Sequence, residues 1–169
     1  MLSQEMQGVI SLLETMQAAA PKEIDPHKVR AGLDQLAAMA KPPKDGIYEP
    51  VDAGGVPAEW IFFAEADEKK VILYFHGGGY VAGSIETHRE FLAHIARATK
   101  RRILAVDYRL APENPFPAAL EDAVTVYRWL LSDCRMSPEN IAIGGDSAGG
   151  GLTLATLLKL KADGEVLPG

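Results

Sequence analysis

Apolar residues recur at helical spacing in the first forty positions of the chain. One stripe predicts an amphipathic helix that ends before Pro21, and it is formed by Leu2, Met6, Val9, Leu13 and Met16. A second helix is predicted to begin at Asp25-Pro26, where an aspartate suited to capping precedes a proline at the first helical position. Pro42 and Pro43 end its pattern. We therefore expect residues 1–43 to form a helical segment distinct from the rest of the chain.

From residue 44 onward, short apolar runs alternate with helical patterns. Strands are predicted at residues 47–51, 58–63, 71–75, 103–106 and 141–144, and helices at 87–99, 117–131 and 149–161. Continuous apolar runs are typical of strands buried on both faces, and their alternation with helices favours a mostly parallel sheet of the α/β class. The helix at 149–161 is apolar nearly all round, so we expect it to be buried. Residues 44–169 are interpreted as one α/β unit.

Composition narrows the range of possible partners. The chain of 169 residues is 47% hydrophobic and 24% charged, which fits a globular domain, and no stretch approaches the ~18 apolar residues of a membrane helix. Its net charge of −6 does not favour a nucleic acid or an anionic membrane as partner. Cys134 is the single cysteine, and the first residues lack the basic and apolar regions of a signal peptide. We therefore expect a cytoplasmic protein.

The run Gly145-Asp146-Ser147-Ala148-Gly149 lies between the strand at 141–144 and the helix that follows it. A G-x-S-x-G run in this context is typical of a nucleophile elbow, a sharp strand-to-helix turn that exposes a serine at its apex. The flanking glycines permit the bend because they carry no Cβ. Ser147 is therefore the candidate catalytic nucleophile, and Asp146 is expected to support the turn by hydrogen bonding.

A second glycine-rich run, His76-Gly77-Gly78-Gly79, follows the strand at 71–75. An acyl-transfer enzyme needs N–H donors aimed at the oxygen that becomes negative in the transition state, and one such donor is worth ~3–4 kcal/mol. We assign this oxyanion hole to Gly77, Gly78, Gly79 and Ala148. Gly78 and Gly79 are expected to donate and Gly77 to shape the turn, while the Ala148 N–H stands at a helix N-terminus. His76 is expected to brace the loop by hydrogen bonds rather than to act as the base.

These motifs leave other functions open. Residues 77–82 also match G-x-G-x-x-A, a dinucleotide-binding pattern, but the residues after it do not begin a helix and no acidic residue ends a strand at the expected distance. Residues 144–151 lack the lysine of a phosphate-binding loop. His27 is expected at the surface, and so is His88, for which the mouth of the pocket is the alternative. No residues have metal-ligand spacing, so no metal is expected. A non-catalytic small-molecule binder on a hydrolase scaffold is the functional alternative.

Together, the motifs resemble those of the bacterial hormone-sensitive-lipase-like esterases, which are carboxylesterases of the α/β-hydrolase fold. The resemblance is carried by residues 76–79 (HGGG), 107–113 (DYRLAPE), 116–119 (FPAA), 121–122 (ED) and 145–150 (GDSAGG). It implies that Ser147 is the nucleophile, that Gly78, Gly79 and Ala148 form the oxyanion hole, and that no cofactor is used. It also implies that the helices of residues 1–43 are cap helices bordering an acyl pocket for short or medium chains.

The resemblance further implies a triad acid and histidine that follow the serine in the chain. Only 22 residues follow Ser147, none of them is a histidine, and their two acids are Asp163 and Glu165 in an expected loop. We therefore expect the chain to correspond to the N-terminal part of such an enzyme, without the later strands of the sheet. Its expected partners are a small ester substrate and either the C-terminal half or a second copy, and the activity of the chain alone is expected to be strongly impaired.

Overall fold

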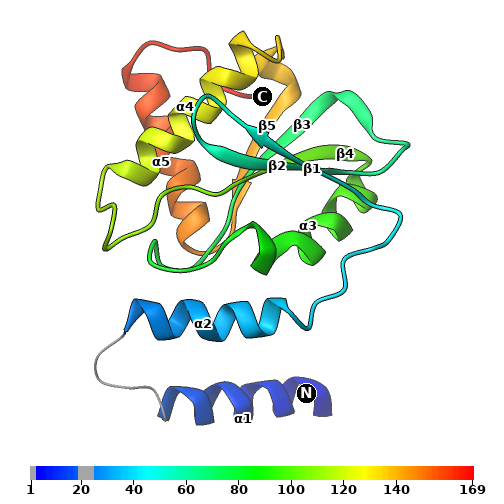
Figure 1. The fold of residues 1–169 in the computed structure, drawn as a ribbon, viewed down its shortest axis with the longest axis vertical. Helices are drawn as coiled ribbons and strands as arrows, with labels where there is room; N and C mark the ends of the chain where they lie inside the picture. The colour runs from blue at the N-terminus through cyan, green and yellow to red at the C-terminus, as the bar shows by residue number, and fades with distance from the viewer. Residues whose placement is uncertain (1–2, 19–24) are drawn as a thin grey trace.

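The computed structural model describes residues 3–18 and 25–169, which form a central sheet with helices packed against it (Figure 1). The helices are α1 (Gln4–Ala18), α2 (Pro26–Ala37), α3 (Ile85–Thr99), α4 (Ala118–Ser132) and α5 (Ala148–Ala162), with a 3₁₀ helix at Pro138–Asn140. The strands are β1 (Ile47–Asp52), β2 (Pro57–Phe62), β3 (Asp67–Phe75), β4 (Arg101–Val106) and β5 (Ile141–Gly145). The predicted helices and strands occur at their expected places with ends shifted by a few residues, whereas the 3₁₀ helix has no counterpart among them. Leu2 and Pro21 lie outside the described residues.

The strands form one mixed sheet in the order β1-β2-β4-β3-β5. β4, β3 and β5 run parallel to one another, whereas β2 is antiparallel to both β1 and β4. A tight turn rather than a crossover helix joins β1 to β2, which is why this end of the sheet is antiparallel. β3 and β5 are neighbours, and Phe75 at the end of β3 is paired with Gly145 at the end of β5. The two glycine-rich motifs therefore leave the sheet side by side.

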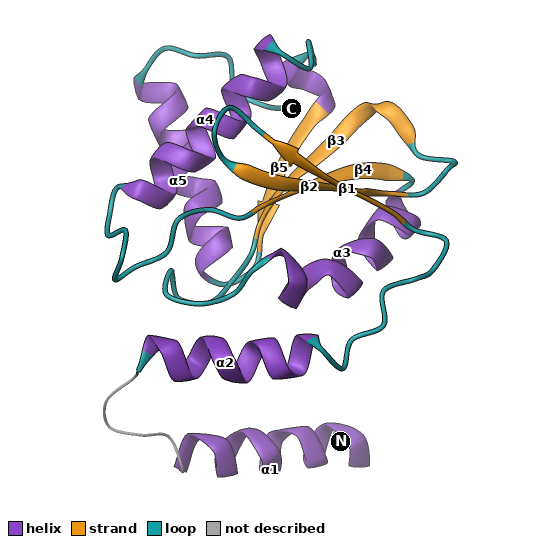
Figure 2. Cartoon of the chain, viewed as in Figure 1, coloured by secondary structure: helices purple, strands orange, loops and turns teal. Residues whose placement is uncertain are grey.

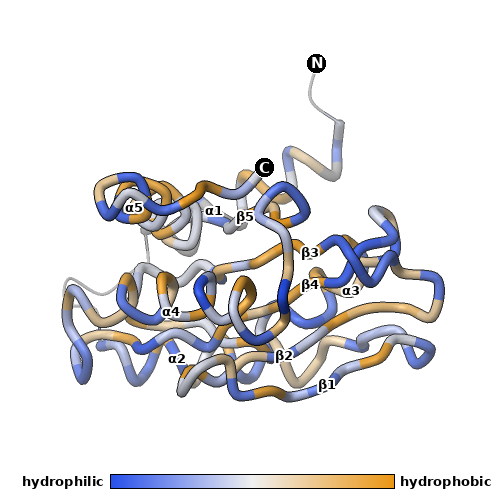
Figure 3. Tube along the Cα trace, turned by 90° about the horizontal axis from the view of Figure 1, so that it is seen from above, coloured by the Kyte–Doolittle hydropathy of each residue, from blue (hydrophilic) through white to orange (hydrophobic). Residues whose placement is uncertain are grey.

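Alternate residues of each strand pack on opposite faces of the sheet. Along β4, Leu104 and Val106 join the core that also contains residues of α4 and α5, while Ile103 and Ala105 join the core that contains residues of α3. Figure 2 shows α4 and α5 on one side of the sheet and α3 on the other. Figure 3 shows apolar stretches along β3 and β4. Burial on both faces fixes the strand ends from which the glycine-rich motifs emerge.

α5 is less buried than its sequence predicts. Leu152 and Leu160 are buried, but Leu154 and Leu158 are 64% and 68% exposed. The expectation of a buried helix is therefore wrong for the face of α5 that carries Leu154 and Leu158, because the sheet and α4 cover only the other face. β5 is open in the same way, since β3 is its only strand neighbour within the part of the chain that the structure describes.

α2 packs on the outside of the molecule and buries none of its residues completely. It lies against α3. After α2, the Lys41 N–H donates a hydrogen bond to Glu90 Oε2 at 3.2 Å. None of the helices in residues 3–18 and 25–169 combines the length and the apolar character needed to cross a bilayer.

Candidate active site

Ser147 occupies a sharp turn between the end of β5 and the start of α5. Its backbone has φ 49° and ψ −118°, a left-handed φ that a residue with a Cβ adopts only under strain. The side chain is exposed and makes no capping hydrogen bond to α5. A strained, exposed serine with an uncommitted hydroxyl has the geometry of the nucleophile elbow that the sequence pattern predicts.

The elbow packs tightly against the end of β3, and this contact requires glycine. A Cβ added at Gly149 would lie 1.9 Å from the carbonyl oxygen of Phe75 and 2.7 Å from that of His76. At Gly145 an added Cβ would lie 2.5 Å from the same Phe75 oxygen. The flanking glycines therefore let the turn lie directly against the strand that carries the second motif.

The glycine loop after β3 also depends on backbone that only glycine adopts readily. Gly78 and Gly79 have φ of 127° and 65°, and a Cβ at Gly78 would lie 2.0 Å from the carbonyl oxygen of Ala82. The turn is closed by Val81 and Ala82, whose N–H groups donate to Gly78 O at 3.2 and 3.0 Å. The N–H groups of Gly78 and Gly79 donate no hydrogen bond to any residue that the structure describes. They are free to bind an acceptor.

Asp146 joins the elbow to the glycine loop. Its Oδ1 accepts hydrogen bonds from the Gly77 N–H at 2.9 Å and from the Tyr74 hydroxyl at 3.1 Å. Gly77 therefore commits its own N–H to Asp146, which suits a residue that shapes the loop. The Ala148 N–H, at the start of α5, has no acceptor in residues 25–169. The carboxylate of Asp146 also raises the pKa of Tyr74, after the larger effect of burial.

His76 is enclosed beneath the glycine loop. It is 2% exposed, its Nδ1 lies 2.7 Å from the Gly77 carbonyl oxygen, and its ring stacks on Tyr108 at 4.3 Å. The Tyr108 hydroxyl donates to the His76 carbonyl oxygen at 2.7 Å. Burial lowers the pKa of His76 to about 4, because a charged imidazole would lose its hydration there. A neutral, stacked imidazole supports the loop.

His88 lies close to His76 and Asp146, although the sequence analysis favoured a surface position for it. Its side chain is only 18% exposed, and its Nε2 lies 3.3 Å from Asp146 Oδ1. The preferred surface placement of His88 is therefore wrong, and the alternative placement beside the site describes it better. The surface placement was favoured because the sequence of α3 does not indicate which of its polar residues face the elbow. Nδ1 of His88 lies 2.8 Å from the Thr87 hydroxyl, so both ring nitrogens have polar neighbours.

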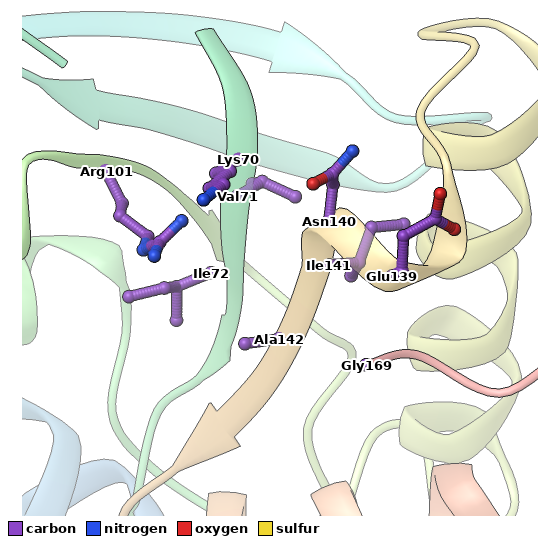
Figure 4. A pocket seen from close by; sticks show the side chains of 9 residues that line it. All are labelled: Lys70, Val71, Ile72, Arg101, Glu139, Asn140, Ile141, Ala142 and Gly169. Atoms are coloured by element: carbon purple, nitrogen blue, oxygen red, sulfur yellow. The ribbon is translucent and has the colours of Figure 1, made fainter. Parts of the chain in front are cut away.

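A hollow at the opposite end of β5 lies apart from these motifs (Figure 4). It is lined by Lys70, Arg101, Glu139 and Asn140, among others, beside the start of the strand. Ser147 follows the other end of the same five-residue strand, about 17 Å away at the usual rise per residue. The hollow is not part of the elbow site. No cluster of three or more histidine, cysteine or acidic side chains suited to a metal occurs in residues 3–18 and 25–169.

Comparison with known proteins agrees with this geometry. Residues 72–169 match the family model of the alpha/beta hydrolase fold. An acetyl-hydrolase of Streptomyces hygroscopicus is 38% identical over 170 residues, which are 99% of this chain and 55% of that protein. The chain therefore belongs to the α/β-hydrolase fold family.

Solved structures place the chain in the same group. The crystal structure of an esterase from the bacterial hormone-sensitive lipase family has a TM-score of 0.88 and 46% identity, with 99% of this chain and 56% of that chain covered. That of EstE5, soaked with p-nitrophenyl butyrate, has a TM-score of 0.89 and 43% identity over the same shares of the two chains. The chain spans about half the length of the curated relatives that it matches.

Proposed function

We propose that this protein is a serine carboxylesterase in which Ser147 attacks the carbonyl carbon of a carboxylic ester. The observation that carries the proposal is the strained, exposed Ser147, whose neighbour Asp146 is hydrogen-bonded to the glycine loop that carries the free N–H groups of Gly78 and Gly79, while the free Ala148 N–H follows it. As Ser147 Oγ bonds to carbon and passes its proton to a base, the carbonyl oxygen becomes negative, and these N–H groups stabilise it. The alcohol then leaves with a proton, and water hydrolyses the acyl-enzyme.

The base for this reaction does not come from the residues that follow Ser147. None of those 22 residues is a histidine, and His76 is buried beneath the glycine loop. His88 lies near the elbow, but its two ring nitrogens already face Asp146 and Thr87. We propose that the triad acid and histidine come from outside this 169-residue sequence, in a longer polypeptide or from a second chain. Loss of triad function costs ~10⁶ in rate and leaves ~10³–10⁴ over water, so the chain alone would be strongly impaired.

We propose short- to medium-chain esters as substrates. The support is the acetyl-hydrolase to which the chain is 38% identical and the EstE5 crystal that was soaked with p-nitrophenyl butyrate. No cofactor takes part in the proposed reaction. The net charge of −6 and the single cysteine favour a cytoplasmic enzyme without a nucleic-acid partner.

A fluorophosphonate probe tests the nucleophile. The protein and its Ser147→Ala variant are each incubated with the probe in the presence of the C-terminal half of a related esterase, which supplies the base, and the labelled residue is located by mass spectrometry. We expect label on Ser147 alone and none in the variant, with Ser132→Ala as a matched control that labels normally. Equal labelling of the Ser147→Ala variant would reject the proposed nucleophile.

Turnover of p-nitrophenyl butyrate tests the proposed origin of the base. The 169-residue chain is measured alone and together with the C-terminal half of a related esterase. We expect a rate far below that of a complete esterase for the chain alone. Full turnover by the chain alone would overturn our proposal for the base. Binding of the ester without labelling or turnover in either condition would favour a non-catalytic binder.

A further inference from the structure

Arg30 connects α2 to the loops around the site. Its guanidinium donates hydrogen bonds from Nε to Val81 O at 2.7 Å and from Nη2 to Ala111 O at 2.8 Å. The same group binds Glu113 through both carboxylate oxygens, at 2.8 Å from Nη1 and 2.7 Å from Nη2. Since no residue of α2 is buried, this polar contact is a principal attachment of the helix.

The backbone acceptors of Arg30 lie in two neighbouring segments. Val81 belongs to the end of the glycine loop, and Ala111 belongs to the segment that is hydrogen-bonded to that loop. Val81 closes the turn on Gly78 through its own N–H, and Tyr80 O accepts from the Ala111 N–H at 2.8 Å. The segment 78–82 is thus stabilised by the hydrogen bonds of its own turn and by hydrogen bonds from Ala111 and Arg30. A displacement of Val81 would move the backbone that carries the N–H groups of Gly78 and Gly79.

We propose that Arg30 is a positioning residue for the oxyanion hole, which holds the glycine loop in place through Val81 and Ala111. The catalytic meaning of this proposal depends on the proposed function, because it assumes that the loop N–H groups stabilise the oxyanion. Arginine suits the task because its planar fork binds a carboxylate through two nitrogens and still has donors for two carbonyls. The hydrogen bond from Arg30 lowers the pKa of Glu113 to about 2, so the pair stays ionised at neutral pH.

Amide hydrogen exchange and NMR test the role of Arg30 without relying on activity. In Arg30→Met, which keeps the aliphatic stem, we expect the hydrogen-bonded amides of Gly77, Val81 and Ala82 to exchange about tenfold faster, because charge-assisted hydrogen bonds that restrain local opening are lost. The ¹H–¹⁵N signals of Gly78 and Gly79 should shift as well. Arg30→Lys should restore part of the protection, since it keeps the charge but loses the fork. Arg128→Met is the matched control and removes an arginine that binds Asp163 and Glu165, so it should leave residues 77–83 unchanged.

Two results would overturn the proposal. One is faster exchange in α2 with unchanged exchange and signals in residues 77–83, which would make Arg30 only an anchor for the helix. The other is no change in either place. If Arg30→Met does not fold, Arg30→Lys provides the comparison, because it loses the planar fork that binds Val81 and Ala111 together. Fluorophosphonate labelling of Ser147 in the presence of the C-terminal half of a related esterase, measured in parallel, shows separately whether the proposed function holds.

Discussion

The carboxylate of Asp146 and the backbone N–H of Gly77 are joined by a 2.9 Å hydrogen bond that spans 69 residues of sequence. Asp146 immediately precedes the elbow serine, and Gly77 begins the turn of the glycine loop. Because Phe75 and Gly145 are paired in the sheet just before these residues, a short side chain is enough to join the two motifs. The proposed nucleophile and its proposed oxyanion donors are therefore held in register by one carboxylate.

Replacing Asp146 tests this connection. We expect Asp146→Ala to lower the free energy of unfolding by ~1–3 kcal/mol, because the N–H of buried Gly77 and the Tyr74 hydroxyl lose a charged acceptor. Asp146→Asn should cost less, since its amide oxygen still accepts from Gly77. Urea denaturation measures the difference. Asp133→Ala, at an exposed position that ends α4, is the control, and an equal loss in that variant would contradict the prediction.

The contact between Gly149 and Phe75 predicts a steric effect. Gly149→Ala would place a Cβ 1.9 Å from the Phe75 carbonyl oxygen, so the elbow and the end of β3 must move apart. We expect a loss of about 3 kcal/mol in stability, as in other overpacked sites. Gly32→Ala makes the same change in α2, where nothing lies within 4 Å, and should stabilise by up to about 1 kcal/mol. Similar thermal midpoints for the two variants would show that the close approach is not rigid.

Burial of His76 predicts a pH-dependent stability. The pKa of His76 is lowered to about 4 from 6.5, so between these values the unfolded chain binds a proton that the folded chain does not. Stability should therefore fall as the pH is lowered from 6.5 toward 4, by up to about 3 kcal/mol. Urea titrations at several pH values measure this slope. His76→Asn should flatten it and His94→Gln, at an exposed position of α3, should not; an unchanged slope in His76→Asn would assign the effect to other groups.

The uncovered side of α5 and the open edge of β5 predict association of the 169-residue chain. Leu154 and Leu158 are 64% and 68% exposed, and an unpaired strand edge can accept another strand. We expect the chain to sediment as dimers or larger species at micromolar concentration. Leu154→Lys combined with Leu158→Lys should shift it toward monomer, whereas Leu36→Lys on α2 should not. A purely monomeric, cooperatively folded wild-type chain would contradict this prediction.

The local pattern of the sequence determined the helices, the strands and both glycine-rich motifs. Ser147 could be recognised because its bend depends on the strand before it, the helix after it and the glycines beside it. The positive φ of Gly78 and Gly79 has the same kind of origin, since only glycine adopts this backbone readily. Interactions between residues a few positions apart are encoded in composition and spacing.

Only the tertiary structure decided which distant residues meet around the elbow. Asp146 contacts His88, and Arg30 contacts Val81 and Glu113. The residues of these pairs are 51 to 83 positions apart in the sequence. The exposure of Leu154 was set in the same way, by which side of α5 the sheet and α4 cover. Hydrophobic periodicity specifies that a face is buried but not what lies against it, because sheet order and helix placement arise from packing of the whole chain.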